Sequence, residues 1–259
     1  MKNIHPTAIV SPEAKIGENI EVGPYAIIEA DVEIGDNCKV GPHACIYDGA
    51  RIGNNVKILQ AAAVSNIPQD LKFDPDFKSQ FYIGDNTTIR EFATLHRGTE
   101  DLGYSKIGSN CLVMAYGHIA HDCIIGNNCI IVNSVQVGGH ARIEDYAIIG
   151  GSTPVHQFSK IGAHAMIGGG LRVVSDVPPF IMAAGEPLRF GNVNIVGLRR
   201  RGFTNDQISN IKDCYKLLYK SGMNTTQAKE AMMEKYPDDE CVAKIVEFIN
   251  NSDRGIIKG

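Results

Sequence analysis

The chain has 259 residues, a formal net charge of -4, and few aromatic side chains, which make up 7% of the total. This length accommodates one large repetitive core with a smaller appendage. The slightly acidic balance argues against general nucleic-acid binding, which needs a basic surface. No apolar run approaches the roughly 20 residues of a membrane span, so we expect no transmembrane segment.

An aliphatic residue recurs at every sixth position over most of the chain. The first series runs without a miss from Ile4 to Val64, and a second runs from Ile83 to Val173 with only Asp101 breaking it. Neither a helix of 3.6 residues per turn nor a strand of period two gives this spacing. It predicts a β-helix of hexapeptide repeats, a mainly β fold. Three hexads per triangular coil would stack residues eighteen apart at the roughly 4.8 Å spacing of paired strands.

The position four residues after each aliphatic is small or β-branched, and we expect it to point inward with the aliphatic. Four of the seven cysteines take this position: Cys38, Cys111, Cys123 and Cys129. A thiol there serves as a small apolar group. With no signal peptide and no CxxC motif, we expect reduced, structural cysteines in a cytoplasmic protein.

Two segments interrupt the repeat and predict loops that leave a rigid scaffold. The first covers residues 65–82, and the second, residues 98–106, keeps the phase but loses the apolar position. Loops of this kind commonly carry function. For the second segment, a tolerated surface insertion is an equally good interpretation.

After Pro178-Pro179 the hexads give way to a helical pattern. Thr204 and Gln207 form a capping box that predicts a helix ending at Ser221-Gly222, and two further helices are expected over 225–235 and 239–250. We therefore divide the chain into a β-helix domain, residues 1–190, and a C-terminal helical domain, residues 191–259. The cluster Arg199-Arg200-Arg201 lies just before these helices and suits phosphates, although a solvated charge run is the ordinary interpretation.

The histidines are clustered within consecutive coils: His118, His121, His140 and His156. Gly139 follows His121 by eighteen residues, so stacking would place its bare N–H beside the imidazole. A base next to an N–H donor suits acyl transfer, and Asp122 would orient the ring. Any single histidine is more often an ordinary surface residue. A zinc site is the other alternative, but no hexad carries the acidic pattern that supports zinc ligands, so we predict no metal.

Several motifs together resemble the UDP-N-acetylglucosamine O-acyltransferases, which catalyse the first step of lipid A synthesis. The resemblance covers nearly the whole chain and includes the helical tail. Its motifs are Pro68-Gln69-Asp70-Leu71-Lys72, Ala120-His121-Asp122-Cys123, Gly138-Gly139-His140, Val155-His156-Gln157-Phe158, Asp176-Val177-Pro178-Pro179 and the segment from Gly197 to Phe203.

The resemblance implies a left-handed parallel β-helix and a homotrimer with active sites between neighbouring subunits. It makes His121 the general base, Asp122 its partner and Gly139 the oxyanion donor. The substrate-binding residues that it implies are Gln69, Asp70, Lys72, His118, His140, His156, Gln157, Asn194, Arg200 and Arg201.

The implied reaction transfers an (R)-3-hydroxyacyl group from acyl carrier protein to the glucosamine 3-position of UDP-N-acetylglucosamine. No cofactor is expected, because the donor travels on the phosphopantetheine of the carrier protein. The acidic carrier would need a positive surface, for which Arg172, Arg189 and the cluster Arg199-Arg200-Arg201 are candidates. The acceptor could carry a 3-hydroxyl or a 3-amine, since a base and an oxyanion hole serve either nucleophile.

Two positions bear on specificity. Val196 stands where the family often has an acidic residue, which bears on nucleotide affinity. Gly169 matches a position where a bulky residue shortens the preferred acyl chain, so glycine predicts donors of about fourteen carbons or more; the alternative is that Gly169 merely permits a corner.

An acetyl-CoA-dependent small-molecule acetyltransferase and a zinc hydratase on the same scaffold are the alternative functions.

Overall fold

The computed structural model describes residues 2–259, whose strands form three sheets that we call faces A, B and C. Face A contains β1 (Asn3–Ile4), β4 (Glu21–Val22), β7 (Lys39–Val40), β10 (Lys57–Ile58), β13 (Thr88–Ile89), β16 (Leu112–Val113), β19 (Ile130–Ile131), β22 (Ile148–Ile149), β25 (Met166–Ile167), β26 (Ile181–Ala184) and β27 (Arg189–Val193). Face B contains β2 (Ile9–Val10), β5 (Ile27–Ile28), β8 (Cys45–Ile46), β11 (Ala63–Asn66), β14 (Thr94–His96), β17 (His118–Ile119), β20 (Gln136–Val137) and β23 (Pro154–Val155). Face C contains β3 (Lys15–Ile16), β6 (Glu33–Ile34), β9 (Ala50–Ile52), β12 (Gln80–Ile83), β15 (Tyr104–Ile107), β18 (Ile124–Ile125), β21 (Arg142–Ile143) and β24 (Lys160–Ile161).

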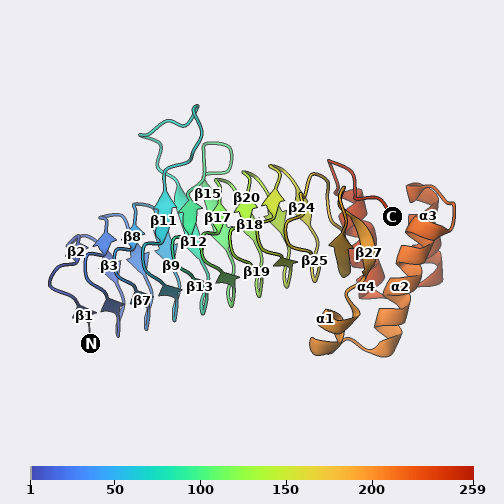
Figure 1. Cartoon of the computed structure of the whole chain (residues 1–259), viewed down its shortest axis with the longest axis horizontal. Helices are drawn as coiled ribbons and strands as arrows, with labels where there is room; N and C mark the ends of the chain where they lie inside the picture. Colours follow the sequence, from blue (N-terminus) through green and yellow to red (C-terminus); the bar gives the residue numbers. More distant parts are fainter. Residues whose placement is uncertain (1) are drawn as a thin grey trace.

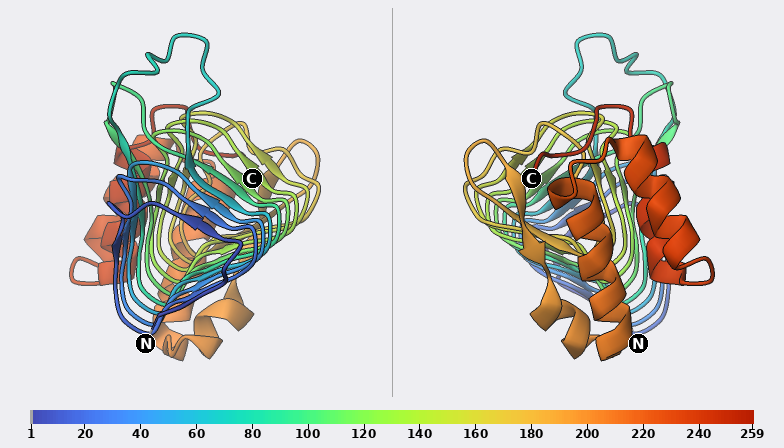
Figure 2. Two further views of the ribbon diagram at one scale, coloured as in Figure 1. Left: turned by 90° about the vertical axis from the view of Figure 1, so that its left-hand side faces the viewer. Right: turned by 90° about the vertical axis from the view of Figure 1, so that its right-hand side faces the viewer.

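The chain winds from face A to B to C and back, so that each coil stacks on the one before it (Figure 1). Ile130 pairs with Ile148, and Ile148 with Met166, all in parallel. This is the eighteen-residue register that the hexads predict. The end-on views in Figure 2 show the triangular outline of the coils. The predicted parallel β-helix of hexapeptide repeats is confirmed.

The interior is filled as the periodicity predicts. The aliphatic of each hexad is buried from Val22 onward, and the small position is fully buried at Ala26, Ala44, Thr87 and Ala141. The four cysteines expected at small positions are buried, and all seven cysteines are free thiols. Only the first coil is less well covered, where Ala8 and Val10 are half-buried.

The coils turn at corners through residues with left-handed backbone conformation. Asparagine, which tolerates positive φ better than most residues, occupies this position at the corner between faces C and A: Asn19, Asn37, Asn55, Asn86, Asn110 and Asn128. At the corner between faces B and C, the B–C corner, the same position holds Asp122, His140 and Phe158, with φ values of 57°, 61° and 64°. These three residues take the same position in successive coils and so form a column along the B–C corner.

Both repeat interruptions leave the stack from the B–C corner. The first connects β11 to β12 and the second connects β14 to β15, and both project beyond the coils (Figure 1). The strands on either side of each loop still pair in parallel, because Lys57 pairs with Thr88 and Thr88 with Leu112 across the longer coils.

The last coil continues into β26, which pairs with β25, and β27 returns antiparallel to it. The predicted domain boundary at 190/191 falls inside β27. Four helices follow at this end of the stack (Figure 2): α1 (Ile195–Arg200), α2 (Asn205–Lys220), α3 (Thr225–Lys235) and α4 (Glu240–Asn250). The capping box of Thr204 and Gln207 and the three predicted helices are confirmed, whereas α1 was not predicted. Among the described residues, none of the helices has the length and apolar character that a membrane crossing requires.

Candidate active site

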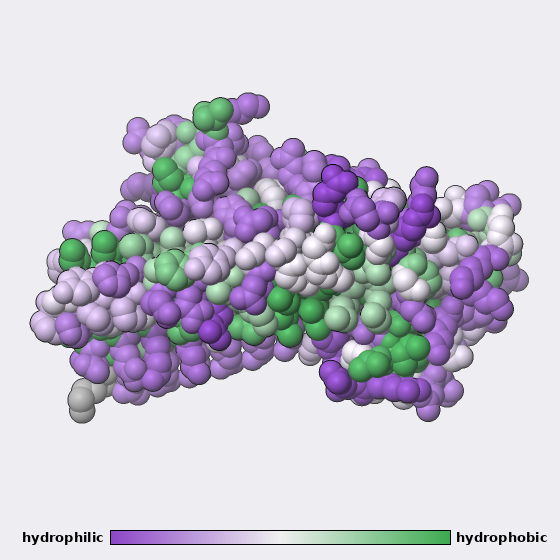
Figure 3. Space-filling model, in the orientation of Figure 1, coloured by the Kyte–Doolittle hydropathy of each residue, from purple (hydrophilic) through white to green (hydrophobic). Residues whose placement is uncertain are grey.

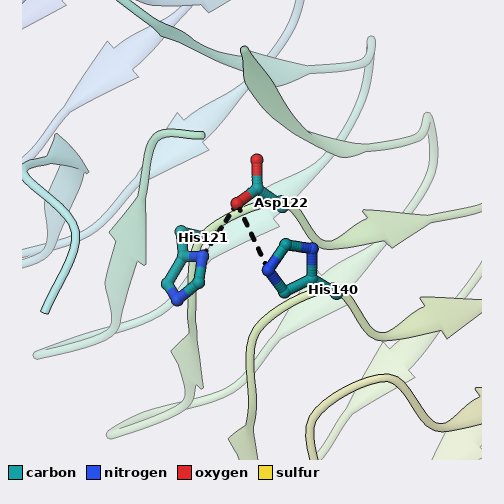
Figure 4. A group of neighbouring side chains, drawn as sticks. All are labelled: His121, Asp122 and His140. Carbon is teal, nitrogen blue, oxygen red and sulfur yellow. Dashed lines mark hydrogen bonds and ion pairs between the residues drawn. The ribbon is translucent and has the colours of Figure 1, made fainter. Parts of the chain in front are cut away.

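The B–C corner carries a histidine and a carboxylate in direct contact (Figure 4). His121 Nδ1 lies 2.8 Å from Asp122 Oδ2. A carboxylate only accepts hydrogen bonds, so Nδ1 bears a proton, and Nε2 is the ring atom left to act as an acceptor when the ring carries one proton. The side chain of Asp122 is wholly buried, whereas that of His121 remains partly exposed. The pair therefore has the form of an oriented base.

Asp122 receives more hydrogen bonds than the one from His121. The backbone N–H of Thr99 donates to Oδ1 at 3.0 Å and the Thr99 hydroxyl donates to Oδ2 at 2.6 Å. Burial by itself would raise the pKa of the Asp122 carboxyl, but the hydrogen bonds from His121 and Thr99 outweigh it and hold the pKa below its ordinary value. Asp122 is therefore a carboxylate.

Gly139 lies directly beside His121, as the eighteen-residue spacing predicts. A Cβ placed on Gly139 would fall 2.7 Å from His121 Cε1 and 2.8 Å from Nε2, so any side chain at this position would displace the imidazole ring. The Gly139 carbonyl accepts from Phe158 N–H. Its own N–H makes no hydrogen bond within residues 2–259, so it is available as a donor next to the imidazole.

His140 is the next side chain in this column. Its Nε2 lies 3.7 Å from Asp122 Oδ2 and 3.6 Å from Asp101 Oδ2, and its ring stacks on Phe158 with centroids 4.4 Å apart. One ligand atom each from His121, Asp122 and His140 lies within 4.8 Å of the others, a set that could hold a metal ion. The sequence spacing alone did not reveal this grouping, because it depends on the corner geometry.

His118 projects outward from β17 on face B. Its Nδ1 lies 2.8 Å from Thr94 Oγ1 and its ring meets the edge of His96 at 5.0 Å. Burial, with smaller contributions from His96 and His121, lowers the pKa of His118 to about 4, so its ring is neutral near pH 7.

His96 was missed in the sequence because it precedes the second loop and belongs to no obvious motif. It is buried, and its Nδ1 donates to the carbonyl of Ile67 at 2.6 Å, which ties the first loop to the corner. Burial lowers the pKa of His96 as well.

The other residues predicted here to contact substrate are exposed, except for the half-buried Asp70. His156 and Gln157 follow β23 one coil beyond Gly138 and Gly139, and His156 Nδ1 lies 3.0 Å from the Gln157 carbonyl oxygen. Gln69, Asp70 and Lys72 lie in the first loop, where Asp70 Oδ1 accepts the Lys72 N–H at 3.0 Å. His156 and Gln157 thus lie on the B–C corner that carries His121, and the other three residues lie in a loop that leaves the same corner after β11.

Asn194, Arg200 and Arg201 lie elsewhere. Asn194 is buried, accepts from Gly197 N–H at 3.1 Å as the cap of α1, and donates to the His164 carbonyl at 3.0 Å. Arg201 Nη1 lies 3.4 Å from His164 Nδ1, and Arg200 is exposed on α1. His164, another residue that sequence reasoning missed, belongs to the corner between faces C and A. Within one chain these groups and His121 therefore occupy different corners.

The two residues expected to bear on specificity, Gly169 and Val196, are exposed. The left-handed residue at the corner of Gly169 is Gly170, with φ 71°, so the backbone does not require glycine at 169. A Cβ on Gly169 would lie 3.1 Å from the Gly151 carbonyl oxygen. Val196 is exposed on α1.

The candidate arginines for a carrier protein differ in their contacts. Arg172 pairs with Glu186 at 3.0 Å, and Arg189 donates to the Gly259 carbonyl at 3.2 Å. Arg199 and Arg200 are exposed at the end of α1.

Comparison with known proteins finds one family of similar proteins over the whole length of the chain. Residues 176–257 match a family described as UDP N-acetylglucosamine O-acyltransferase, domain 2, and residues 13–48, 31–62 and 104–139 match bacterial transferase hexapeptide repeats. An acyl-[acyl-carrier-protein]--UDP-N-acetylglucosamine O-acyltransferase of Chlorobaculum tepidum is 57% identical over 96% of this chain and 94% of its own. The protein of the same name from Burkholderia lata is 44% identical over the full length of both.

Solved structures of proteins with this family name superimpose closely on the chain. The UDP-N-acetylglucosamine acyltransferase of Bacteroides fragilis superimposes with a TM-score of 0.96 at 46% identity, covering 98% of this chain and all of that one. The Francisella novicida enzyme gives 0.95 at 39% identity, covering 99% and 94%. The chain belongs to the acyl-[acyl-carrier-protein]--UDP-N-acetylglucosamine O-acyltransferase family.

Proposed function

We propose that this protein transfers an (R)-3-hydroxyacyl group from acyl carrier protein to the 3-position of the glucosamine ring in UDP-N-acetylglucosamine or its 3-amino analogue. One observation carries the chemistry. His121, fixed by the buried Asp122 carboxylate, presents Nε2 beside Gly139, whose N–H is unpaired within residues 2–259. A proton acceptor and an oxyanion donor then flank the same small space, as acyl transfer requires.

The steps follow from these two groups. His121 Nε2 takes the proton from the acceptor hydroxyl or amine as its oxygen or nitrogen bonds to the thioester carbon. Gly139 N–H donates to the oxyanion of the tetrahedral intermediate. When the intermediate collapses, the C–S bond breaks and the proton on His121 passes to the leaving thiolate. The Asp122 carboxylate stabilises the imidazolium between these steps, and no acyl-enzyme forms.

The substrate contacts are assigned to the groups that surround this pair. Gln69, Asp70 and Lys72 would hold the acceptor sugar from the first loop, while His118, His140, His156 and Gln157 line the corner. Asn194, Arg200 and Arg201 would contact the UDP moiety. Because these three lie at a different corner from His121, we assign them to the site of a neighbouring subunit.

A homotrimer would complete the site in this way, and face A offers the surface for it. Figure 3 shows apolar surface over the middle of the stack. On face A, the outward side chains of successive strands form an apolar stripe along the stack axis: Leu112, Ile130, Ile148, Met166 and Met182. The outward side chains of face C at the same level are mostly polar: Lys106, Ile124, Arg142 and Lys160. An apolar stripe on one face of a stack indicates contact with another copy.

The experiment that tests the proposal is mass spectrometry of the product formed by purified enzyme. UDP-N-acetylglucosamine and its 3-amino analogue are offered with a mixture of hydroxyacyl carrier proteins, and acetyl-CoA is offered in a parallel reaction. We expect a mono-hydroxyacylated UDP-sugar from the carrier protein alone. Product from acetyl-CoA only would refute the proposal.

The grouping of His121, Asp122 and His140 calls for one further arm. The same reaction is run after dialysis against a chelator, with metal content measured before and after. Loss of activity that returns with zinc alone would favour metal chemistry over base catalysis by His121.

A further inference from the structure

The orientation of Asp122 is not determined by His121 alone. Two imidazoles face its Oδ2, that of His121 at 2.8 Å and that of His140 at 3.7 Å (Figure 4). A modest rotation of the carboxylate would let it bond to His140 instead. The ring of His121 would then lose the acceptor that holds its Nδ1–H.

Thr99 is the group that opposes this rotation. It donates to both carboxylate oxygens, through its N–H to Oδ1 and its hydroxyl to Oδ2, and Asp122 and Thr99 are both buried. Two donors on two oxygens of one carboxylate fix the plane of the group as well as its position. Hydrogen bonds to a buried charged group are also among the stronger ones in proteins.

Thr99 is itself held firmly at the base of the second loop. The Ser79 hydroxyl donates to the Gly98 carbonyl at 2.6 Å, and Gly98 N–H donates to the Gln80 carbonyl at 3.3 Å. The Thr99 carbonyl accepts from Gly103 N–H at 2.7 Å and closes the loop. A tolerated surface insertion would not need these buried contacts to the neighbouring coil.

We propose that Thr99 is a positioning residue for the acyl transfer, and that the second loop is there to present it to Asp122. The hydroxyl of Thr99 keeps the carboxylate on the side of His121 and away from His140. This inference rests on the proposed role of His121 as the base. Thr99 touches no substrate in this account and acts only through Asp122.

Two variants of Thr99 isolate the hydroxyl. Thr99→Val keeps the shape and the backbone N–H but removes the donor to Oδ2, whereas Thr99→Ser keeps the donor. We expect Thr99→Val to lower kcat by about 10- to 100-fold, the range set by one hydrogen bond to a charged group, with little change in KM for the UDP-sugar. Thr99→Ser should restore most of the turnover.

A matched control separates positioning from stability. Thr87 is another buried threonine whose hydroxyl donates to the Gly108 carbonyl at 2.8 Å and accepts from Cys111 N–H, but it lies at the corner between faces C and A. Thr87→Val should lower the melting temperature and leave kcat near that of the wild type. A fall in kcat of equal size in Thr87→Val and Thr99→Val would overturn the proposal.

A second readout does not depend on turnover. The Nδ1–H proton of His121, hydrogen-bonded to a buried carboxylate, should give a far-downfield proton resonance that disappears in His121→Ala, which identifies it. That resonance should weaken or shift in Thr99→Val and be retained in Thr99→Ser. An unchanged resonance together with wild-type kcat in Thr99→Val would show that Thr99 positions nothing.

His121→Ala separates a failure of the proposed mechanism from a failure of the role of Thr99. Wild-type turnover in His121→Ala would remove the base and with it the proposed mechanism. An inactive His121→Ala beside a fully active Thr99→Val would remove only the role of Thr99.

Discussion

A methyl group at Gly139 tests the proposed catalytic geometry most directly. Alanine at this position needs no unusual backbone, since Gly139 does not adopt positive φ. Its Cβ would nevertheless lie 2.7 Å from His121 Cε1, whereas ordinary contact begins at 3.4 Å. The imidazole of His121 must therefore move by roughly 0.7 Å, given those two distances. That movement pulls Nδ1 away from Asp122 or turns Nε2 away from the acceptor.

A displacement of about 1 Å at a reacting group can cost on the order of 100-fold in rate. We expect Gly139→Ala to lower kcat by about that factor, while the free energy of unfolding changes by less than about 2 kcal/mol because the ring is partly exposed and can move. Steady-state kinetics with a hydroxyacyl carrier protein measures the first quantity, and denaturant unfolding measures the second.

Gly151 provides the control, because it occupies the equivalent turn position at an A–B corner, away from the B–C corner of Gly139, and its Cβ would meet nothing closer than 3.3 Å. Gly151→Ala should therefore keep near-wild-type kcat. If Gly139→Ala also turns over at the wild-type rate, the arrangement of His121 and Gly139 described above does not carry the chemistry.

Further predictions concern the partner of the base, the donor, the assembly and the response to pH. Asp122→Asn should lower kcat by about 10⁴-fold by favouring the wrong tautomer of the base, while calorimetry should show nearly unchanged UDP-sugar affinity; a small kcat effect contradicts this. Gly169→Met should shift preference toward shorter donors at roughly 0.8 kcal/mol per methylene excluded, and identical ranking of ten-, twelve- and fourteen-carbon donors would speak against a chain-length role. Ile148→Asp on face A should yield monomers in sedimentation, and a persistent trimer would place the interface elsewhere. The pKa of His118 is about 4 in the folded protein, below its unfolded value, so its contribution to stability is complete above about pH 6.5 and is lost as the pH falls toward 4. His118→Gln should therefore make the free energy of unfolding less dependent on pH between about pH 6.5 and 4. Equal pH dependence in the variant and the wild type would contradict this.

Much of the fold could be predicted because the β-helix repeats one rule. Each hexad has the same inward positions, so the spacing alone fixes the register, and through it the pairing of His121 with Gly139. The capping box of Thr204 and Gln207 is a local signal of the same kind, and it predicts where α2 begins. Local and repeated signals survive in the sequence because no distant residue is needed to interpret them.

What could not be predicted depends on contacts between distant segments. Thr99 lies in a loop whose sequence has no motif, and only the folded corner brings it to Asp122. His164 and Arg201 meet because α1 returns to the last coils, and no periodicity marks that return. The separation of Arg201 from His121 within one chain likewise appears only when the corners are assigned to faces.

Because of the eighteen-residue register, distances along the stack axis between equivalent positions change only in whole-coil steps. Side chains in one corner column, such as Asp122, His140 and Phe158, can be separated only by whole coils of roughly 4.8 Å, since a partial coil would turn the side chain onto another face. Coarse adjustment of a binding groove along the axis must therefore come from adding or removing coils, and fine adjustment from the size of single side chains. Under the proposed function, a single substitution such as Gly169→Met would then change the accepted acyl chain in steps finer than one coil.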